Sequence, residues 1–267
     1  MAKALPLITY SDLESQVEAL ERDGYAYFPA VINSEEIAEL RAVMDRLEAL
    51  EESFDRHNSP QNGSGFLNKI INNSFNRDPL FLQYLDNPQL INVVETVHGS
   101  DCHIIGMQSW LTGPGRPDQS LHTDWLPISL PEDVATNPRV KIPIFITTAH
   151  YYLDDISEEL GPTNFVTGSH RSGRSPSGET EWQGGEEMSI LCNAGDVVVF
   201  RSEVWHRGTA NTSDKTRYLL QVHYAMRMIT QKFPPYLNRF QFDDSILAQA
   251  TPRQRRLLGE HGGGAYD

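Results

Sequence analysis

The spacing of the hydrophobic residues changes near residue 100. Before that point apolar side chains recur at helical spacing, as at Leu13, Val17 and Leu20, which predicts amphipathic helices. We expect the first helix to begin at a capping box formed by Ser11 and Glu14. After residue 100, short runs such as CHIIGMQSWLT, IPIFITTAHYYL, DVVVF and TRYLLQVHYAM alternate in polarity or are rich in β-branched residues, which is typical of strands.

Segments rich in glycine, proline, asparagine and aspartate separate these runs, among them GPGRPD, ELGP, SGRSPSG, NAGD and ANTSD. Many short strands joined by such turns indicate a sandwich or a barrel. We therefore expect a mainly β fold with flanking helices: a helical part over residues 1–100, a β core over about 101–230 and one C-terminal helix over about 244–259. Because no linker-like stretch divides the chain, we expect residues 1–267 to form a single domain.

The charge balance limits the classes of partner. The 267 residues include 22 lysines and arginines against 36 aspartates and glutamates, a net charge of −14. Such a surface repels nucleic acid and anionic lipid, so we expect neither as a partner, and a small-molecule substrate instead. The two cysteines, Cys102 and Cys192, form no CxxC pair or zinc-ligand pattern, and the opening MAKALPLITY lacks a signal-peptide run. We expect free thiols, a cytoplasmic location and a monomer or homodimer.

The segment SLHTDW carries a histidine and an aspartate two positions apart, His122 and Asp124. Alternate side chains of a strand point to the same face, so both groups can be directed at one point while Thr123 turns away. An imidazole and a carboxylate suit a divalent first-row metal. HxD pairs also arise by chance in a chain with nine histidines, and a hydrogen-bonded surface pair is the alternative. His206, which follows the strand DVVVF, can complete a 2-His-1-carboxylate triad, which is typical of non-haem Fe(II) enzymes.

Several longer stretches resemble the phytanoyl-CoA dioxygenase family of Fe(II)- and 2-oxoglutarate-dependent oxygenases. They are GYAYFPAVINSEEIAELRAVMDRL, the HTD motif, LDDISEELGPTNFVTGSHR and AGDVVVFRSEVWHRGTANTSDKTR, and the resemblance covers nearly the whole chain. The last stretch places Arg217 eleven residues after His206, as the family pattern does. The resemblance implies a double-stranded β-helix, that is, a cupin-like jelly-roll core with helices packed outside it.

The resemblance also implies the cofactors and the residues that bind them. His122, Asp124 and His206 would bind Fe(II), and 2-oxoglutarate and O2 would be cosubstrates, with ascorbate as an optional stimulant of turnover. Arg217 would pair with the remote carboxylate of 2-oxoglutarate, for which a permanently charged, bidentate guanidinium is well suited. Four further polar residues are candidates to contact 2-oxoglutarate: Gln108, Gln119, Thr148 and His150. For each of these four, the alternative is a polar side chain that is hydrogen-bonded within the barrel wall.

The candidate substrate contacts are aromatic and amide side chains: Phe66, Asn68, Asn73, Trp110 and Trp125. Most of them belong to two segments, 63–75 and 125–141, which we expect to act as lids over the metal site. Segment 125–141 follows Asp124 directly and is stiffened by three prolines. The alternative is that the aromatic residues belong to the core and the asparagines form turns. His223 shares a strand face with Arg217 by alternation, and we expect it to be a hydrogen-bonded core histidine.

The resemblance implies an enzyme that oxidises a C–H bond of a small metabolite, by hydroxylation or a related outcome such as desaturation or oxidative dealkylation. The acidic chain shows no basic cluster for a CoA thioester. The amide and aromatic groups of the two candidate lids suit a neutral or zwitterionic small molecule, so we expect a metabolite of natural-product or amino-acid-derivative metabolism. Two alternatives remain. One is a catalytically silent jelly-roll protein that binds a small ligand. The other is a cupin-type metalloenzyme that does not use 2-oxoglutarate, and such an enzyme would need no carboxylate anchor at Arg217.

Overall fold

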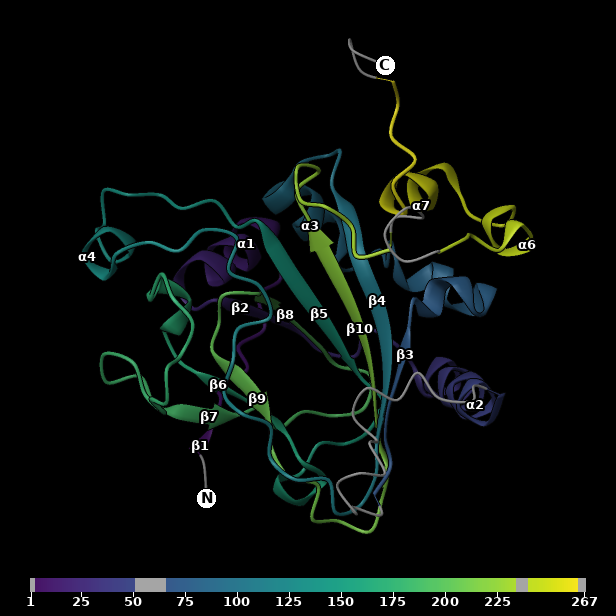
Figure 1. The fold of residues 1–267 in the computed structure, drawn as a ribbon, viewed down its shortest axis with the longest axis horizontal. Helices are drawn as coiled ribbons and strands as arrows, with labels where there is room; N and C mark the ends of the chain where they lie inside the picture. The colour runs from purple at the N-terminus through teal and green to yellow at the C-terminus, as the bar shows by residue number, and fades with distance from the viewer. Residues whose placement is uncertain (1–2, 51–65, 234–239, 264–267) are drawn as a thin grey trace.

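A computed structural model describes residues 3–50, 66–233 and 240–263 of the chain (Figure 1). Its strands are β1 (Lys3–Ala4), β2 (Tyr25–Phe28), β3 (Asn68–Asn72), β4 (His103–Thr112), β5 (Ile146–Tyr152), β6 (Thr163–Val166), β7 (Glu187–Ser189), β8 (Val197–Arg201), β9 (His206–Gly208) and β10 (Arg217–Ala225). Its α-helices are α1 (Leu13–Arg22), α2 (Ser34–Leu50), α3 (Ile91–His98), α4 (Glu132–Ala135), α6 (Asp244–Leu247) and α7 (Pro252–Leu257). Short 3-10 helices occur at Ser74–Asn76, Pro79–Tyr84, Glu158–Leu160 and Ser169–Arg171.

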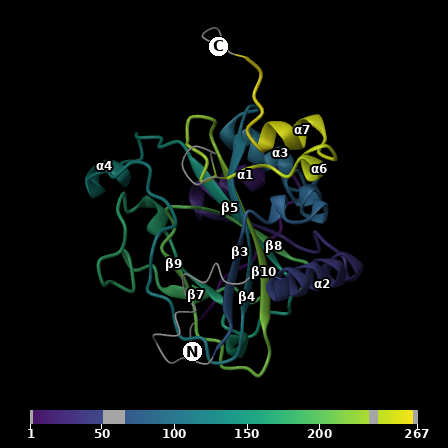
Figure 2. The same cartoon turned by 45° about the vertical axis from the view of Figure 1, so that its right-hand side comes forward.

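The strands form two sheets that face each other (Figures 1 and 2). The large sheet has six strands in the order β2-β8-β5-β10-β4-β3, and all neighbouring strands are antiparallel. The small sheet has four strands in the order β1-β7-β6-β9. Two facing, mainly antiparallel sheets form a jelly-roll core. The predicted mainly β fold with a double-stranded, cupin-like β-helix and flanking helices is therefore confirmed.

The two faces of the large sheet bury different sets of side chains, as strand β8 shows. Val197 and Val199 pack with the helices, whereas Val198 and Phe200 point between the two sheets and pack with residues such as Phe165. This double burial explains why the segment DVVVF is apolar at almost every position. Helices α2, α3, α6 and α7 cover the face of the large sheet that is turned away from the small sheet (Figure 2). At one end of the molecule, polar side chains occupy the space between the two sheets.

The start of α1 differs from the predicted capping box. Helix α1 begins at Leu13, and Asp12 rather than Ser11 is its N-cap. The Asp12 carboxylate accepts a hydrogen bond of 2.8 Å from the backbone N–H of Ser15. Because this carboxylate reaches the third backbone N–H of the helix, Asp12 satisfies a donor that Ser11, one residue earlier, does not reach.

The C-terminal segment contains two short helices in place of the single helix predicted over about 244–259. Helix α6 ends at Leu247, and α7 begins at Pro252. Proline has no backbone N–H and cannot continue a helix, but it is favoured in the first turn of a new one. Thr251 and Gln254 form a capping box that starts α7. The predicted division of the chain into one domain, with the helical and β parts described above, stays a prediction.

Two whole-chain expectations concern thiols and membranes. Cys102 and Cys192 are both free, as predicted, and both are buried. Over the ranges that the structure describes, no helix combines the length and the apolar character needed to cross a bilayer. The expected location and oligomeric state remain predictions.

Candidate metal centre

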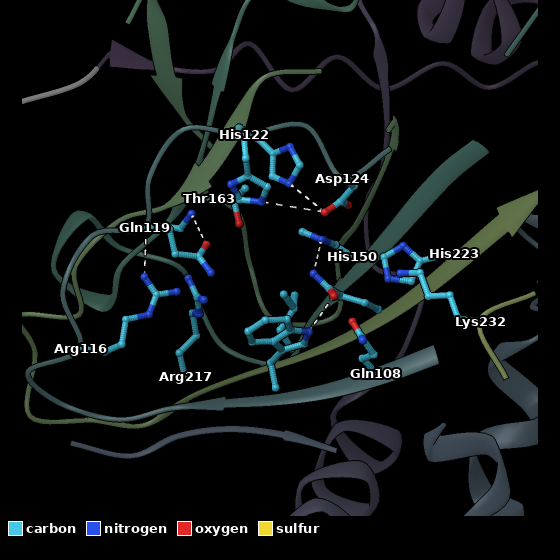
Figure 3. A pocket seen from close by; sticks show the side chains of 15 residues that line it. Gln108, Arg116, Gln119, His122, Asp124, His150, Thr163, Arg217, His223 and Lys232 are labelled. Carbon is cyan, nitrogen blue, oxygen red and sulfur yellow. Dashed lines mark hydrogen bonds and ion pairs between the residues drawn. The ribbon is translucent and has the colours of Figure 1, made fainter. Parts of the chain in front are cut away.

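Three side chains that could bind a metal converge between the two sheets (Figure 3). One nitrogen or oxygen atom from each of His122, Asp124 and His206 lies within 4.8 Å of the others. Nε2 of His206 is 3.5 Å from Oδ1 of Asp124, and Nε2 of His122 is 3.9 Å from the same oxygen. Among the described residues, this is the one group of three such side chains that is arranged to hold an ion.

Backbone pairing brings the HTD segment to strand β9. His122 and His206 exchange two backbone hydrogen bonds, of 2.9 and 2.8 Å, so their rings lie next to each other with centroids 4.4 Å apart. The backbone N–H of Asp124 donates to the carbonyl of Ser202, which fixes the next alternate position. Thr123 points away, with its hydroxyl 2.8 Å from that of Ser175. The HTD segment therefore extends the small sheet by one short bridge and presents its first and third side chains together.

The backbone also determines which ring nitrogens carry protons. Nδ1 of His122 lies 2.8 Å from the carbonyl oxygen of Ser120, and Nδ1 of His206 lies 2.9 Å from that of Val204. Because a carbonyl oxygen can only accept, each Nδ1 carries a hydrogen, and in the neutral ring each Nε2 keeps its lone pair. Both lone pairs belong to the atoms nearest Asp124, which is the tautomer that binds a metal. The donor set thus fits a divalent first-row cation.

The charge states suit the same conclusion. Burial raises the pKa of the Asp124 carboxyl, but the imidazoles of His206, His223 and His122 outweigh burial and hold that pKa below its usual range. Burial lowers the pKa of His122, and the neighbouring His206 lowers it further. Burial would lower the pKa of His206, but the Asp124 carboxylate outweighs burial and raises it, so a proton on His206 competes with a metal ion for the same carboxylate. The ionised Asp124 beside the neutral His122 is the protonation state that metal binding requires.

Thr148 is hydrogen-bonded to both the Asp124 carboxylate and His223. The hydroxyl of Thr148 donates to Oδ2 of Asp124 at 3.3 Å and lies 2.9 Å from Nδ1 of His223. Since its one proton goes to the carboxylate, the Thr148 oxygen accepts from the N–H of His223. Thr148 was expected to contact 2-oxoglutarate, but it is fully buried and does not line the pocket. In the structure its hydroxyl supports the Asp124 carboxylate, and its contact with 2-oxoglutarate stays a prediction.

Replacing Thr148 with valine is expected to lower the affinity for Fe(II) about 10- to 100-fold, the usual effect of losing a group that orients a metal ligand. The matched control is Thr147→Val, because Thr147 is the adjacent buried threonine and lies 2.8 Å from Nε2 of buried His98. Each variant removes a hydroxyl that is hydrogen-bonded to a buried histidine, so both should lose about 1–3 kcal/mol of unfolding free energy. Only Thr148→Val should change the Fe(II) affinity measured by anaerobic calorimetry. Equal Fe(II) affinity in the two variants would remove Thr148 from the metal centre.

A pocket opens at the three metal-binding side chains. Of the residues expected near the metal from the sequence, those that line it are Gln108, Trp110, Gln119, His150 and Arg217, together with His122, Asp124 and His206. Five further side chains line the pocket without being predicted from the sequence: Arg116, Thr163, Leu219, Gln221 and Lys232. His223 also lines the pocket, and its Nε2 has no hydrogen-bond partner among the described residues.

Polar side chains of three strands form one wall of this pocket. Gln221 of β10 is paired directly with Gln108 of β4 and with His150 of β5, so all three point to the same face. Gln221 accepts a hydrogen bond of 2.6 Å from the indole N–H of Trp110, and its amide donates to Nε2 of His150 at 2.7 Å. The amide of Gln108 donates to Asn72 at 2.8 Å. These groups are bonded to one another, and the expected contacts of Gln108 and His150 with 2-oxoglutarate stay predictions.

Three expected substrate contacts, Phe66, Asn68 and Asn73, are not among the residues that line the pocket. Asn68 is buried in β3 and is paired with Thr112 of β4 at the edge of the large sheet. Asn73 has a left-handed backbone with φ of 54°, which turns the chain from β3 into a 3-10 helix. The segment expected as a lid is therefore largely a strand and a turn, apart from residues 63–65, which lie outside the described residues.

The other expected lid, segment 125–141, leads away from the metal. The backbone N–H of Leu130 donates to the carbonyl of Gly173, and α4 follows beside a second pocket lined by residues such as His170 and Lys141. Trp125 does not line the metal pocket; it packs beside Phe145 and Ile105. Its ring lies 4.5 Å from the ammonium of Lys232, which does line the pocket. Trp125, the first residue of this segment, thus contacts the site only through Lys232.

Arg217 lies at the start of β10 and is only 4% exposed. Its Nη1 donates to the carbonyl of Gly161, and its Nε has no partner. No carboxylate forms an ion pair with it in the described ranges, although the charge of Asp154 acts on it. Burial lowers the pKa of this guanidinium below its usual range. A buried cation with so few partners is costly, and an anion in the pocket would offset that cost.

Comparison with known proteins identifies a family and several similar folds. The family model described as phytanoyl-CoA dioxygenase (PhyH) matches residues 20–219. The uncharacterized protein Mb1539 of Mycobacterium bovis is 25% identical over 259 residues, which are 93% of this chain and 87% of that protein. The fold is similar to the epimerase SnoN in complex with Fe3+, alpha ketoglutarate and nogalamycin RO, with a TM-score of 0.65, 22% identity and coverage of 85% and 89%. It is also similar to HygX from Streptomyces hygroscopicus with nickel and 2-oxoglutarate bound, with a TM-score of 0.64, 18% identity and coverage of 86% and 91%.

Proposed function

Because this chain belongs to the phytanoyl-CoA dioxygenase family and is thus an Fe(II)- and 2-oxoglutarate-dependent oxygenase, we propose that it oxidises a C–H bond of a small metabolite. The observation that carries this proposal is the pairing of two features in one pocket. His122, Asp124 and His206 present a metal-binding set, and the buried guanidinium of Arg217 lines the same cavity. When bound, iron together with 2-oxoglutarate and O2 supplies an oxidant for an unactivated C–H bond, with release of succinate and CO2.

The residues of the chain have separate tasks in this proposal. His122, Asp124 and His206 hold the metal, and the carbonyls of Ser120 and Val204 keep both imidazoles in the metal-binding tautomer. Arg217 binds the remote carboxylate of 2-oxoglutarate, far from the reacting atoms. The polar wall of Gln108, Trp110 and Gln221 and the ammonium of Lys232 then face the remaining space, where a substrate would bind.

We infer a polar small molecule, of natural-product or amino-acid-derivative metabolism, as the substrate. Amide, indole and ammonium groups in the wall favour a ligand with several hydrogen-bonding groups. The net charge of −14 disfavours a polyanion such as a CoA thioester. The similarity to SnoN, described as an enzyme from nogalamycin biosynthesis, supports the natural-product class. Hydroxylation, desaturation and oxidative dealkylation all begin at a C–H bond, and the position of the substrate chooses among them.

An anaerobic titration followed by exposure to air tests the proposal. The protein should bind one Fe(II), and 2-oxoglutarate should then bind only to the iron-loaded form. On addition of O2, we expect slow formation of succinate even without an added substrate, which a subsequent screen of polar metabolites should accelerate. Binding of iron without binding of 2-oxoglutarate would favour the cupin-type metalloenzyme. Binding of neither would favour the catalytically silent ligand-binding protein.

A further inference from the structure

A second arginine lies beside Arg217 at the same end of the pocket. Arg116 belongs to the segment that joins β4 to the HTD motif, and it is only 3% exposed. Figure 3 shows both arginine side chains on the side of the pocket opposite Lys232 and His223, below Gln119. His122 and Asp124 lie away from both arginines in the same view. One end of the cavity is therefore formed by two guanidinium groups.

No carboxylate forms an ion pair with Arg116 among the described residues, although the charge of Asp118 acts on it. Its Nη1 donates to the carbonyls of Pro117, Gly208 and Thr209 at 2.9, 3.0 and 3.3 Å. Its Nε is buried without a partner, and its Nη2 makes no hydrogen bond with the described residues. Carbonyl oxygens orient a guanidinium but do not neutralise it. Arg116 therefore resembles Arg217, whose one hydrogen-bond acceptor is also a backbone carbonyl.

Two adjacent buried cations are unfavourable unless an anion lies between them. Burial lowers the pKa of Arg116 to about 10, and the neighbouring charge of Arg217 contributes to this shift. Desolvation of each charge and repulsion between the two both raise the free energy of the empty pocket. A carboxylate that accepts hydrogen bonds from both groups would remove both costs, and its two oxygens can serve two donors.

Gly208 is the position that lets Arg116 reach the pocket. A Cβ atom at residue 208 would lie 2.7 Å from Nη2 of Arg116 and 2.9 Å from Oε1 of Gln119. The backbone N–H of Gly208 donates to that same Gln119 oxygen at 2.8 Å, and its carbonyl accepts from Arg116. Gly208 is two residues after His206, so β9 places a metal-binding side chain and the support of Arg116 on one short strand. The position of this guanidinium is thus fixed relative to the metal centre.

We propose that Arg116 and Arg217 together bind the remote carboxylate of 2-oxoglutarate, and that Arg116 makes the pocket select dicarboxylic over monocarboxylic 2-oxo acids. The proposal rests on the proposed function, and it adds a residue that determines specificity. The ligand is placed with its oxo-acid end toward the metal and its remote carboxylate between the two guanidinium groups. Gln119 and the Gly208 backbone hold Arg116 in the orientation that this requires.

The test compares two ligands that differ only in the remote carboxylate, 2-oxoglutarate and 2-oxopentanoate. Their affinities for the anaerobic, Fe(II)-loaded protein are measured by calorimetry. Arg116→Gln is expected to weaken the binding of 2-oxoglutarate roughly tenfold to a hundredfold, which is the effect of one lost charge-assisted contact. The binding of 2-oxopentanoate should weaken less than about twofold. Arg116→Lys should keep part of the preference for 2-oxoglutarate over 2-oxopentanoate. The matched control is Arg256→Gln, because Arg256 pairs with Glu95 outside the pocket and should leave both affinities unchanged.

Gly208→Ala provides a second variant that keeps the arginine and displaces it. It should weaken 2-oxoglutarate more than 2-oxopentanoate, because the new methyl group occupies the space of Arg116 Nη2. Equal weakening of the two ligands by Arg116→Gln would show a purely structural role, and unchanged binding would show none; either result overturns the proposal. Failure of the wild-type protein to bind 2-oxoglutarate when iron is bound would instead refute the proposed function itself.

Discussion

His122→Ala, Asp124→Ala and His206→Gln are each expected to abolish iron-dependent succinate formation while the jelly-roll remains folded. Each removes one of the three atoms that converge on the metal position. Loss of a group that merely orients a ligand already costs roughly 10- to 100-fold in metal affinity, so loss of a ligand should exceed about 100-fold. Glutamine is chosen at residue 206 because the ring packs against Phe200 at 5.1 Å, and alanine would leave a cavity there.

The measurements are Fe(II) affinity under anaerobic conditions, succinate formation in air and thermal unfolding. The control is His261→Ala, which removes a histidine that is partly exposed and bonded to His103 at 3.1 Å, outside the pocket. This control should bind iron like the wild type. If any one of the three site variants kept wild-type iron affinity, that residue would not be a ligand.

Alternation along strands made much of this site predictable from the sequence. Arg217, Leu219, Gln221 and His223 are alternate residues of β10, and all four line the pocket. The same parity places Gln108 and Trp110 of β4 in the wall. Because a strand shows every second side chain to one face, a single correctly placed residue determines its neighbours. Leu219 and Gln221 could therefore have been assigned to the site from the position of Arg217 alone.

Residues outside the strands could not be placed in this way. Arg116 belongs to GPGRPD, a segment that the sequence identifies only as a turn. Two of its three partners are carbonyls of β9 and the following turn, more than ninety positions later in the chain. Segment 125–141 begins next to a metal ligand, yet its direction depends on the pairing of Leu130 with Gly173. Neither contact has a periodic or compositional pattern. Such long-range contacts depend on the packing of the finished fold, and the residues next to them in sequence do not encode them.

Pattern alone also cannot distinguish a residue that touches a ligand from one that supports it. Thr148 and His150 occupy alternate positions of β5 and were expected to act alike. The structure places His150 in the pocket wall and Thr148 between Asp124 and His223. This difference comes from the neighbouring strand β10 and the HTD segment. They fill the space over Thr148 and leave the space over His150 open.

Arg217→Lys is expected to raise the KM for 2-oxoglutarate roughly tenfold to a hundredfold, because a bidentate, charge-assisted contact worth about 1.5–3 kcal/mol is lost. A lysine ammonium keeps the charge but not the planar fork, and it cannot donate to Gly161 and to the ligand in the same geometry. We expect kcat with saturating 2-oxoglutarate to change much less, since the remote carboxylate is bound equally before and during the reaction.

The matched control for this prediction is Arg201→Lys, another buried arginine of the large sheet that is paired with Glu203 and lies outside the metal pocket. It should lower stability to a similar degree and leave the KM unchanged. The division between KM and kcat is the decisive measurement. A fall in kcat with an unchanged KM would place Arg217 near the reacting atoms, and an unchanged KM and kcat would mean that Arg116 alone binds the remote carboxylate. If Arg217→Lys raises the KM for 2-oxoglutarate, and Arg116→Gln weakens the binding of 2-oxoglutarate more than that of 2-oxopentanoate, both guanidinium groups must contact the same ligand.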